Sequence, residues 1–207
     1  MQATTLDLTH PDLLRRMEGL VTLINAMDCL SESVAVWLNI QDNQSYGITH
    51  RLHDEHPWPI AESDATYLRP KQGEKIVYRR GSLWADLRGK EVRLATADAL
   101  VVWSRLPTSV RADLTNQVPL GVALQKVGAK RQTDPAIFTR AVGEDDSQRL
   151  EVHLTSTLLV AGRPWARTRE VLDQVIVEHR EPSPEALRQW MVWSASRPPA
   201  TTHSPAV

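Results

Sequence analysis

Residues 75–104 read KIVYRRGSLWADLRGKEVRLATADALVVWS, and the fold class is most evident in these residues. Two runs rich in β-branched and aromatic residues, Lys75 to Leu87 and Val92 to Ser104, flank the turn sequence Leu87-Arg88-Gly89-Lys90. Such runs favour β-strands, and the short glycine-containing turn between them predicts a hairpin. Because a hairpin joins antiparallel neighbours, the stretch predicts part of an antiparallel sheet.

A second hairpin is predicted further along the chain. Residues 149–160 and 165–177 have strand composition, and Val160-Ala161-Gly162-Arg163 lies between them as a turn. Residues 46–52 predict one more strand, whereas the proline-rich, acidic segment 53–73 predicts a long loop with a short helical piece. Several neighbouring strands with short turns indicate one antiparallel sheet.

Helices are expected on both sides of these strands in the sequence. Apolar residues recur at helical spacing between residues 13 and 27, and residues 33–40 favour either a helix end or a strand. Pro107 and Pro119 each open a short helix, and this pair is a candidate cover for a pocket. A last helix is expected after Ser183.

The predicted class is therefore α+β: a single antiparallel sheet with flanking helices and helical flaps over an internal ligand cavity. Residues 1–196 are expected to form one domain, with 197–207 as a disordered tail, because that end is rich in proline, serine and threonine. A chain of 207 residues with 42% hydrophobic residues can bury one substantial core.

Charge and cysteine content narrow the functional classes. A formal net charge of −1 provides no general attraction to nucleic acid or to an anionic membrane, so neither partner is expected. The single cysteine, Cys29, excludes an intramolecular disulfide and fits a reducing compartment. With no apolar leader and no long apolar run, the sequence predicts a cytoplasmic protein.

Several short segments match one known family in order and spacing. They are His50-Arg51-Leu52-His53-Asp54, Arg105-Leu-Pro, Pro119-Leu120-Gly121, and Gly162-Arg163-Pro164 with Glu170 eight residues after the glycine. Over roughly residues 12–194 the chain resembles the chorismate pyruvate-lyase family, particularly its actinobacterial and archaeal branch. Each motif is common by itself, so the resemblance depends on their order over the whole length.

The resemblance implies a carbon–oxygen lyase that needs no metal and no organic cofactor. Such an enzyme converts chorismate to 4-hydroxybenzoate and pyruvate, for quinone or other secondary metabolite biosynthesis. The protein's tasks in this elimination are to bind two carboxylates, orient the ether and move a proton. The implied partners are the substrate and product, and the implied assembly is a monomer or homodimer.

The resemblance assigns the catalytic roles to Glu170 and Arg80. Strand alternation places Glu170 on one face with Ala166 and Thr168, where loss of water would help it hold or exchange a proton. Arg80 would grip the ring carboxylate through paired hydrogen bonds. Its neighbour Arg79 points to the opposite side of the strand and is the alternative match.

The remaining site residues are expected to bind substrate. Leu120 and Gly121 in Pro-Leu-Gly, and Leu30 and Ser31 near the end of the first helix, match positions that line the family's cavity. Arg105 is also matched, although a structural ion pair explains it equally well.

Two other features concern metals and aromatic ligands. The histidine and acidic residues between His50 and His56 do not follow a known metal-ligand spacing, so no metal is expected. Trp84 shares strand parity with Arg80 and is therefore the tryptophan expected beside an aromatic ligand.

Two alternatives to chorismate lysis stay open. One is a non-catalytic protein of the same fold that binds small molecules such as aromatic acids. The other is a related enzyme with a different small substrate. Glu32 and Arg169 motivate the latter, because the family usually has a basic residue and a threonine at those positions.

Overall fold

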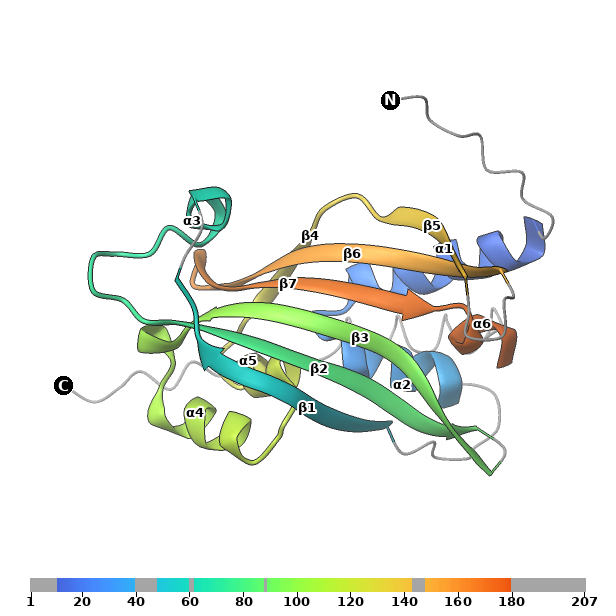
Figure 1. Ribbon diagram of the computed structural model, residues 1–207, viewed down its shortest axis with the longest axis horizontal. Coiled ribbons are helices and arrows are strands. Elements are labelled where there is room, and N and C mark those ends of the chain that lie inside the picture. The colour runs from blue at the N-terminus through green and yellow to red at the C-terminus, as the bar shows by residue number, and fades with distance from the viewer. Residues whose placement is uncertain (1–10, 40–47, 60–61, 88, 143–147, 180–207) are drawn as a thin grey trace.

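The computed structural model describes residues 11–39, 48–59, 62–87, 89–142 and 148–179 of the 207-residue chain. These residues form a seven-stranded sheet with helices packed on it (Figure 1). Every recorded strand pair is antiparallel, which confirms the predicted α+β class with a single antiparallel sheet. The strands are β1 (Ile48–Pro57), β2 (Ile76–Leu87), β3 (Lys90–Val102), β4 (Lys130–Thr133), β5 (Ile137–Val142), β6 (Gln148–Val160) and β7 (Arg163–Asp173).

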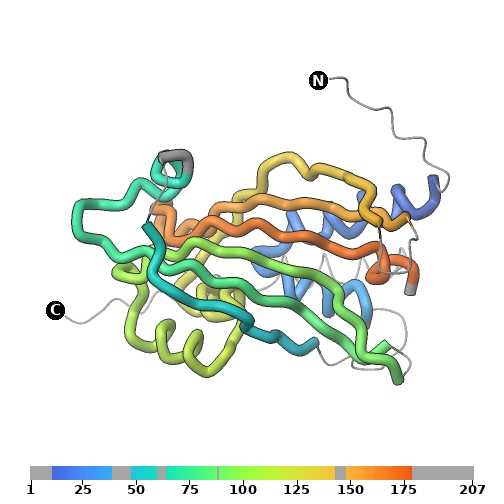
Figure 2. The backbone as a smooth tube through the Cα atoms, in the orientation of Figure 1, coloured from blue at the N-terminus to red at the C-terminus, as the bar shows by residue number. Residues whose placement is uncertain are grey.

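The two predicted hairpins form the middle of this sheet. The strand order is β1-β2-β3-β7-β6-β4, with β5 also paired to β6, so β3 and β7 join the β2–β3 and β6–β7 hairpins (Figure 2). Ala161 and Gly162 both have positive φ, 48° and 74°, at the turn between β6 and β7. A two-residue turn of this kind matches the twist of the strands it connects.

Five α-helices of the described residues cover one face of the sheet, in two groups. The first group, α1 (Pro11–Ala26), α2 (Leu30–Asn39) and α6 (Val175–His179), packs on one end of the sheet. Its core includes Met17, Leu20, Ile24, Leu83, Leu154 and Leu172. The second group, α4 (Thr108–Thr115) and α5 (Leu120–Gln125), packs on the other end with a core that includes Val101, Leu114, Leu124 and Ala166.

The remaining helix, α3 (Glu62–Leu68), lies on the opposite face. Its Leu68 packs with Ile76 and Val102. These two strand residues are partners, and their side chains lie on the face of the sheet opposite the two larger cores. No helix among the described residues is long and apolar enough to cross a membrane.

The space between the two cores is set by small residues. Along β3, Ala95 belongs to the first core and Val101 to the second, while Ala97 lies between them on the same face. Gly81 is the partner of Ala97 on β2. Two adjacent positions without large side chains leave a hollow that the flanking cores do not fill.

The sequence predictions missed strand at three places, whereas the helical alternative for residues 33–40 is found as far as Asn39. The segment expected as a loop from residue 53 continues β1 to Pro57, and residues 30–39 form one helix, α2. The short strands β4 and β5 were not predicted. All three strands lie at sheet edges with half-buried or exposed residues, so they lack the apolar alternation by which strands are recognised.

Other predictions fall beyond the described residues. The helix expected after Ser183 and the tail 197–207 both lie there, so the domain limit at residue 196 stays a prediction.

Candidate functional site

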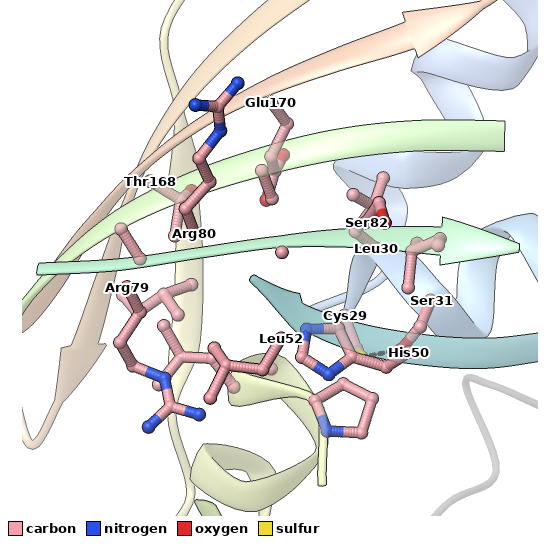
Figure 3. A pocket seen from close by; sticks show the side chains of 18 of the residues that line it. Cys29, Leu30, Ser31, His50, Leu52, Arg79, Arg80, Ser82, Thr168 and Glu170 are labelled. Atoms are coloured by element: carbon pink, nitrogen blue, oxygen red, sulfur yellow. Dashed lines mark hydrogen bonds between the residues drawn. The ribbon is translucent and has the colours of Figure 1, made fainter. Parts of the chain in front are cut away.

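A cavity of about 80 Å³ occupies the hollow between the two cores. The sheet forms its floor, and the α1–α2 junction and the start of α5 lie across it (Figure 3). Most of its wall is hydrocarbon, contributed by Leu30, Leu52, Leu83, Ala97, Ala99, Pro119, Leu120 and Leu158. The helical pair opened by Pro107 and Pro119 therefore contributes to the cover, as predicted, through α5.

The floor of the cavity is a row of residues that crosses four strands. Leu52, Gly81, Ala97 and Glu170 are successive partners on β1, β2, β3 and β7. A Cβ atom on Gly81 would lie 2.6 Å from His50 Nε2 and 2.9 Å from the Arg51 carbonyl oxygen. Glycine is therefore required here, because the backbone and His50 approach too closely for any side chain.

Glu170 lies in this floor and is only 4% exposed. Ala166 and Thr168 lie on the same face of β7, in agreement with the predicted alternation. Both carboxylate oxygens accept hydrogen bonds from Arg131 of β4, whose Nη1 is 3.0 Å from Glu170 Oε1 and whose Nη2 donates to Oε2. Arg131 Nε also donates to Thr133 Oγ1 at 3.1 Å. Glu170 is thus held in a two-pronged buried ion pair.

The structure corrects the choice between the two neighbouring arginines. Arg79 and Arg80 leave β2 in opposite directions (Figure 3), and Arg79 shares the face of Gly81 and Glu170. The Arg80 side chain is 61% exposed and pairs with Asp98 at 3.8 Å on the other face. Arg80 is among the lining residues, but its guanidinium points away from Glu170, so the structure favours the alternative match, Arg79, because one residue along a strand reverses the face.

Arg79 is buried, although its guanidinium is occupied by the chain itself. Nη1 donates to Glu55 Oε2, and Nη2 donates to the Leu114 carbonyl oxygen at 3.3 Å. Burial lowers the pKa of Arg79, and the neighbouring Glu55 opposes that effect. Arg79 therefore lines the cavity as one half of a β1–β2 ion pair.

Arg105 lies away from the cavity, which contradicts the substrate-binding assignment and supports the structural alternative. Its Nε is 3.0 Å from Glu74 Oε1 and its Nη2 is 2.6 Å from Glu74 Oε2. It also donates to the carbonyl oxygens of Leu68, Arg69 and Pro164. Arg105 thus ties the end of α3 to the β6–β7 turn.

The other four predicted binding residues do line the cavity, namely Leu30, Ser31, Leu120 and Gly121. Leu30 begins α2 rather than ending α1, because the chain breaks helix at residues 27–29. A Cβ atom on Gly121 would lie 3.0 Å from Cys29 Sγ, so α5 approaches the α1–α2 junction closely. Gly121 lines the cavity without a side chain, so α5 also brings backbone atoms to it.

The α1–α2 junction is fixed to β4 by Asp28. Asp28 Oδ1 accepts a hydrogen bond from the Arg131 backbone N–H at 3.0 Å, and Oδ2 pairs with Lys130 Nζ at 2.8 Å. The same short strand that supplies Arg131 to Glu170 thus also positions the loop over the cavity.

Two titratable groups in the wall are shifted toward their neutral forms. Burial lowers the pKa of His50, although its hydrogen bond with the Gln117 carbonyl oxygen opposes the shift. Burial raises the pKa of the Cys29 thiol, and the contact of 3.2 Å between Cys29 Sγ and Ser31 Oγ acts in the other direction. Near neutral pH both groups are uncharged.

One polar atom in the wall is left without a partner. Thr168 is 5% exposed, and among the described residues nothing forms a hydrogen bond with its Oγ1. A buried hydroxyl of this kind has unused donor and acceptor capacity, which a bound molecule can satisfy.

The other residues singled out in the sequence lie outside the cavity. Trp84 does not line it: its ring lies 4.5 Å from the Arg51 guanidinium carbon and its Nε1 donates to Ser82 Oγ. The expectation that Trp84 stands beside the ligand was therefore wrong. Glu32 accepts a hydrogen bond from Gln125 of α5, and Arg169 pairs with Asp64 on the opposite face.

Sequence reasoning missed the polar residues that complete the cavity: Asp28, Arg131 and the unpaired hydroxyl of Thr168. Arg131 lies in the sequence Lys130-Arg131-Gln132-Thr133, which has no apolar alternation and gives no indication that the arginine is buried. Gly81 gave a weak indication of the cavity floor, because a glycine within a predicted strand indicates a close approach of another group or an irregularity of the strand.

Comparisons with known proteins identify the fold. No protein-family model matches the chain, and no curated protein sequence matches it. PhnF from Mycobacterium smegmatis is 13% identical, with a TM-score of 0.51, and the match covers 74% of this chain and 66% of PhnF.

The effector domain of PhnF gives 13% identity and a TM-score of 0.50, over 70% of this chain and 88% of that domain. A GntR-family transcriptional regulator from Enterococcus faecalis V583 is 14% identical, with a TM-score of 0.42. The match covers 60% of this chain and 92% of the regulator chain. The likeness to PhnF and to its effector domain shows a shared fold, and the α+β architecture is the predicted chorismate lyase-like one.

Proposed function

We propose that this protein binds a small, ring-sized organic molecule in the cavity between its two cores and does not convert it chemically. The observation that carries the proposal is an apolar cavity whose candidate catalytic side chains are already engaged within the chain. Glu170 is held by Arg131, and Arg79 is held by Glu55. Specific small-molecule sites are typically concave, mostly apolar and supplied with a few polar groups.

The engaged state of Glu170 favours binding over proton transfer. A carboxylate that takes a proton loses its charge, which weakens both hydrogen bonds from Arg131 and leaves the buried arginine without an anionic partner. The likeness to a structure described as an effector domain supports the same choice.

Titration calorimetry with a panel of small aromatic compounds tests the proposal, with Ala97→Leu as the variant that fills the cavity. We expect at least one compound to bind the parent protein. Its affinity for the Ala97→Leu variant should be at least tenfold weaker. The matched control is Thr96→Leu, which points to the opposite face of the same strand and leaves binding unchanged. Binding that survives Ala97→Leu would reject this cavity as the site.

A second candidate is the chorismate pyruvate-lyase activity implied by the family resemblance. One observation favours it: Glu170 and Arg79 line one cavity from the same face of the sheet. Incubation of the purified protein with chorismate, followed by measurement of pyruvate, tests it. Release that exceeds the spontaneous background and disappears in Glu170→Gln supports a lyase, and release at the background rate rejects one.

A further inference from the structure

We propose that the cavity selects an uncharged ring compound whose hydroxyl or amide group hydrogen-bonds to Thr168 and Glu170, and that it discriminates against carboxylates of the same shape. This inference rests on the proposed function, since it names the class of ligand for the same cavity. Three features of the wall carry it: the pairing of its charges, the neutrality of its other titratable groups, and one unpaired hydroxyl.

Every cation in the described wall already has an anionic partner. Arg131 is bound to both oxygens of Glu170, and Arg79 is bound to Glu55 and to a backbone carbonyl oxygen. Arg80 is the third lining arginine, and its guanidinium lies on the opposite face with Asp98. A ligand carboxylate therefore meets no unoccupied guanidinium among the described residues.

The anions are paired in the same way. Asp28 is bound to Lys130 and to the Arg131 backbone N–H, and Glu170 has Arg131. His50 and Cys29 add no charge near neutral pH, because burial favours their uncharged forms. A cationic ligand thus finds no vacant carboxylate in the described wall.

A charged ligand has to break a buried ion pair or stay unpaired itself. If a carboxylate takes Arg131, then Glu170 is left charged, about 4% exposed and without its partner. Removal of one partner from a buried ion pair is strongly unfavourable, because the remaining charge is not solvated. An uncharged ligand avoids this cost.

Polar groups that accept a neutral partner are available on the same side of the cavity. Thr168 Oγ1 is buried without a partner, and Glu170 lies two residues further along the same face of β7. A carboxylate in a two-pronged pair keeps lone pairs that can accept another hydrogen bond. A hydroxyl or amide N–H can donate to Glu170, and Thr168 can donate to or accept from the same ligand.

The test compares 4-hydroxybenzamide with 4-hydroxybenzoate, which have nearly the same shape and differ in charge at pH 7.5. By titration calorimetry with the full chain, we expect the amide to bind at least tenfold more tightly than the carboxylate. Equal or tighter binding of the carboxylate overturns the inference and leaves the proposed function standing. If neither compound binds, and no compound of the wider aromatic panel binds either, the inference and the proposed function are both rejected.

Thr168→Val tests the contact assigned to the hydroxyl, because valine keeps the shape and removes the oxygen. We expect the affinity for the amide to fall at least threefold, while the urea midpoint of the free variant is unchanged or higher. That combination separates a ligand contact from a structural role, which would lower the midpoint. Unchanged affinity in Thr168→Val overturns the assignment of this residue.

Discussion

At the residue scale, the cavity depends on a buried ion pair between strands that are distant in the sequence. The Arg131 and Glu170 side chains are 3% and 5% exposed and are joined through both carboxylate oxygens. Desolvation of two charges offsets much of their attraction, so the pair contributes little net stability. Loss of one partner destabilises the protein strongly, because the other charge stays buried without a partner.

Substitution of Arg131 by methionine should therefore be strongly destabilising. We expect the free energy of unfolding to fall by about 3–5 kcal/mol, because Glu170 is left charged and unpaired. Urea denaturation measures the change. The double variant Arg131→Met, Glu170→Leu should recover most of the loss, and the exposed Arg80→Met should change stability by less than about 1 kcal/mol. A double variant no more stable than the single one would contradict this account.

The sequence predicted the face of Glu170 within its own strand but not which of the two arginines lies on the same side of the sheet. Alternation along β7 correctly placed Glu170 on the face of Ala166 and Thr168, because one strand is enough to define its own two faces. The choice between Arg79 and Arg80 required a second fact, the face of β2 that meets Glu170. That face is fixed by the pairing of Ala97 with both Gly81 and Glu170, which a single sequence does not contain.

At the element scale, the short strand β4 connects the cavity floor to its cover. Its Arg131 side chain reaches Glu170, while the Arg131 backbone N–H donates to Asp28 in the α1–α2 junction. Within the part of the chain that the structure describes, β4 pairs only with β6, through residues 156–159, so the Asp28 contacts contribute to holding it.

Removal of the Asp28 carboxylate should loosen this connection. In Asp28→Ala we expect faster hydrogen–deuterium exchange at the Arg131 amide and in the α1–α2 junction, because the amide loses its acceptor. Mass spectrometry of exchanged peptides measures the effect. Asp113→Ala, which removes an ion pair between α4 and Lys126, is the control and should leave β4 unchanged. Identical exchange of β4 in both variants would show that Asp28 does not hold the strand.

The connection between α3 and the β6–β7 turn should respond to acid. Hydrogen bonds from Arg105 lower the pKa of Glu74 to about 2, against an ordinary value near 4.5. The folded state therefore binds this proton less readily than the unfolded state, so the contribution of Glu74 to stability is present above about pH 4.5 and is lost as the pH falls toward 2.

We expect the difference in free energy of unfolding between the parent protein and Glu74→Gln to shrink steadily from pH 5 to pH 2. Urea denaturation at a series of pH values gives this difference. Asp86→Asn, whose carboxylate accepts a bond from the Gly89 backbone N–H, is the matched control at another turn. A difference that does not depend on pH would show that Glu74 is not held as an ionised partner of Arg105.

At the element scale the sequence predicted the two long hairpins because their strands carry dense apolar and β-branched runs. It did not predict β4, β5 or the second half of β1. β4 and the second half of β1 are polar on both faces and β5 is only six residues long, so their strand conformation depends more on pairing with neighbours than on local preference.

At the scale of the whole molecule, the site is the space between two hydrophobic cores on one sheet face. The α1–α2–α6 group and the α4–α5 group each pack fully against the sheet, and Gly81 and Ala97 leave the strip between them open. Because the cavity arises from this division, it was predictable only in outline, as a pocket beneath a helical cover. Its paired charges come from β1, β2, β4, β7 and the α1–α2 junction, and the sequence alone does not show that these segments meet.

A crystal structure of the protein soaked with the tightest neutral ligand would show whether this cavity is the binding site. We predict electron density for the ring between Ala97 on the sheet and Leu30 and Leu120 on the cover, with a polar ligand atom within hydrogen-bond distance of Thr168 Oγ1. The Arg131–Glu170 pair should stay intact beside it. Density for the ligand only outside this cavity, or a ligand carboxylate that has displaced Glu170 from Arg131, would contradict the account.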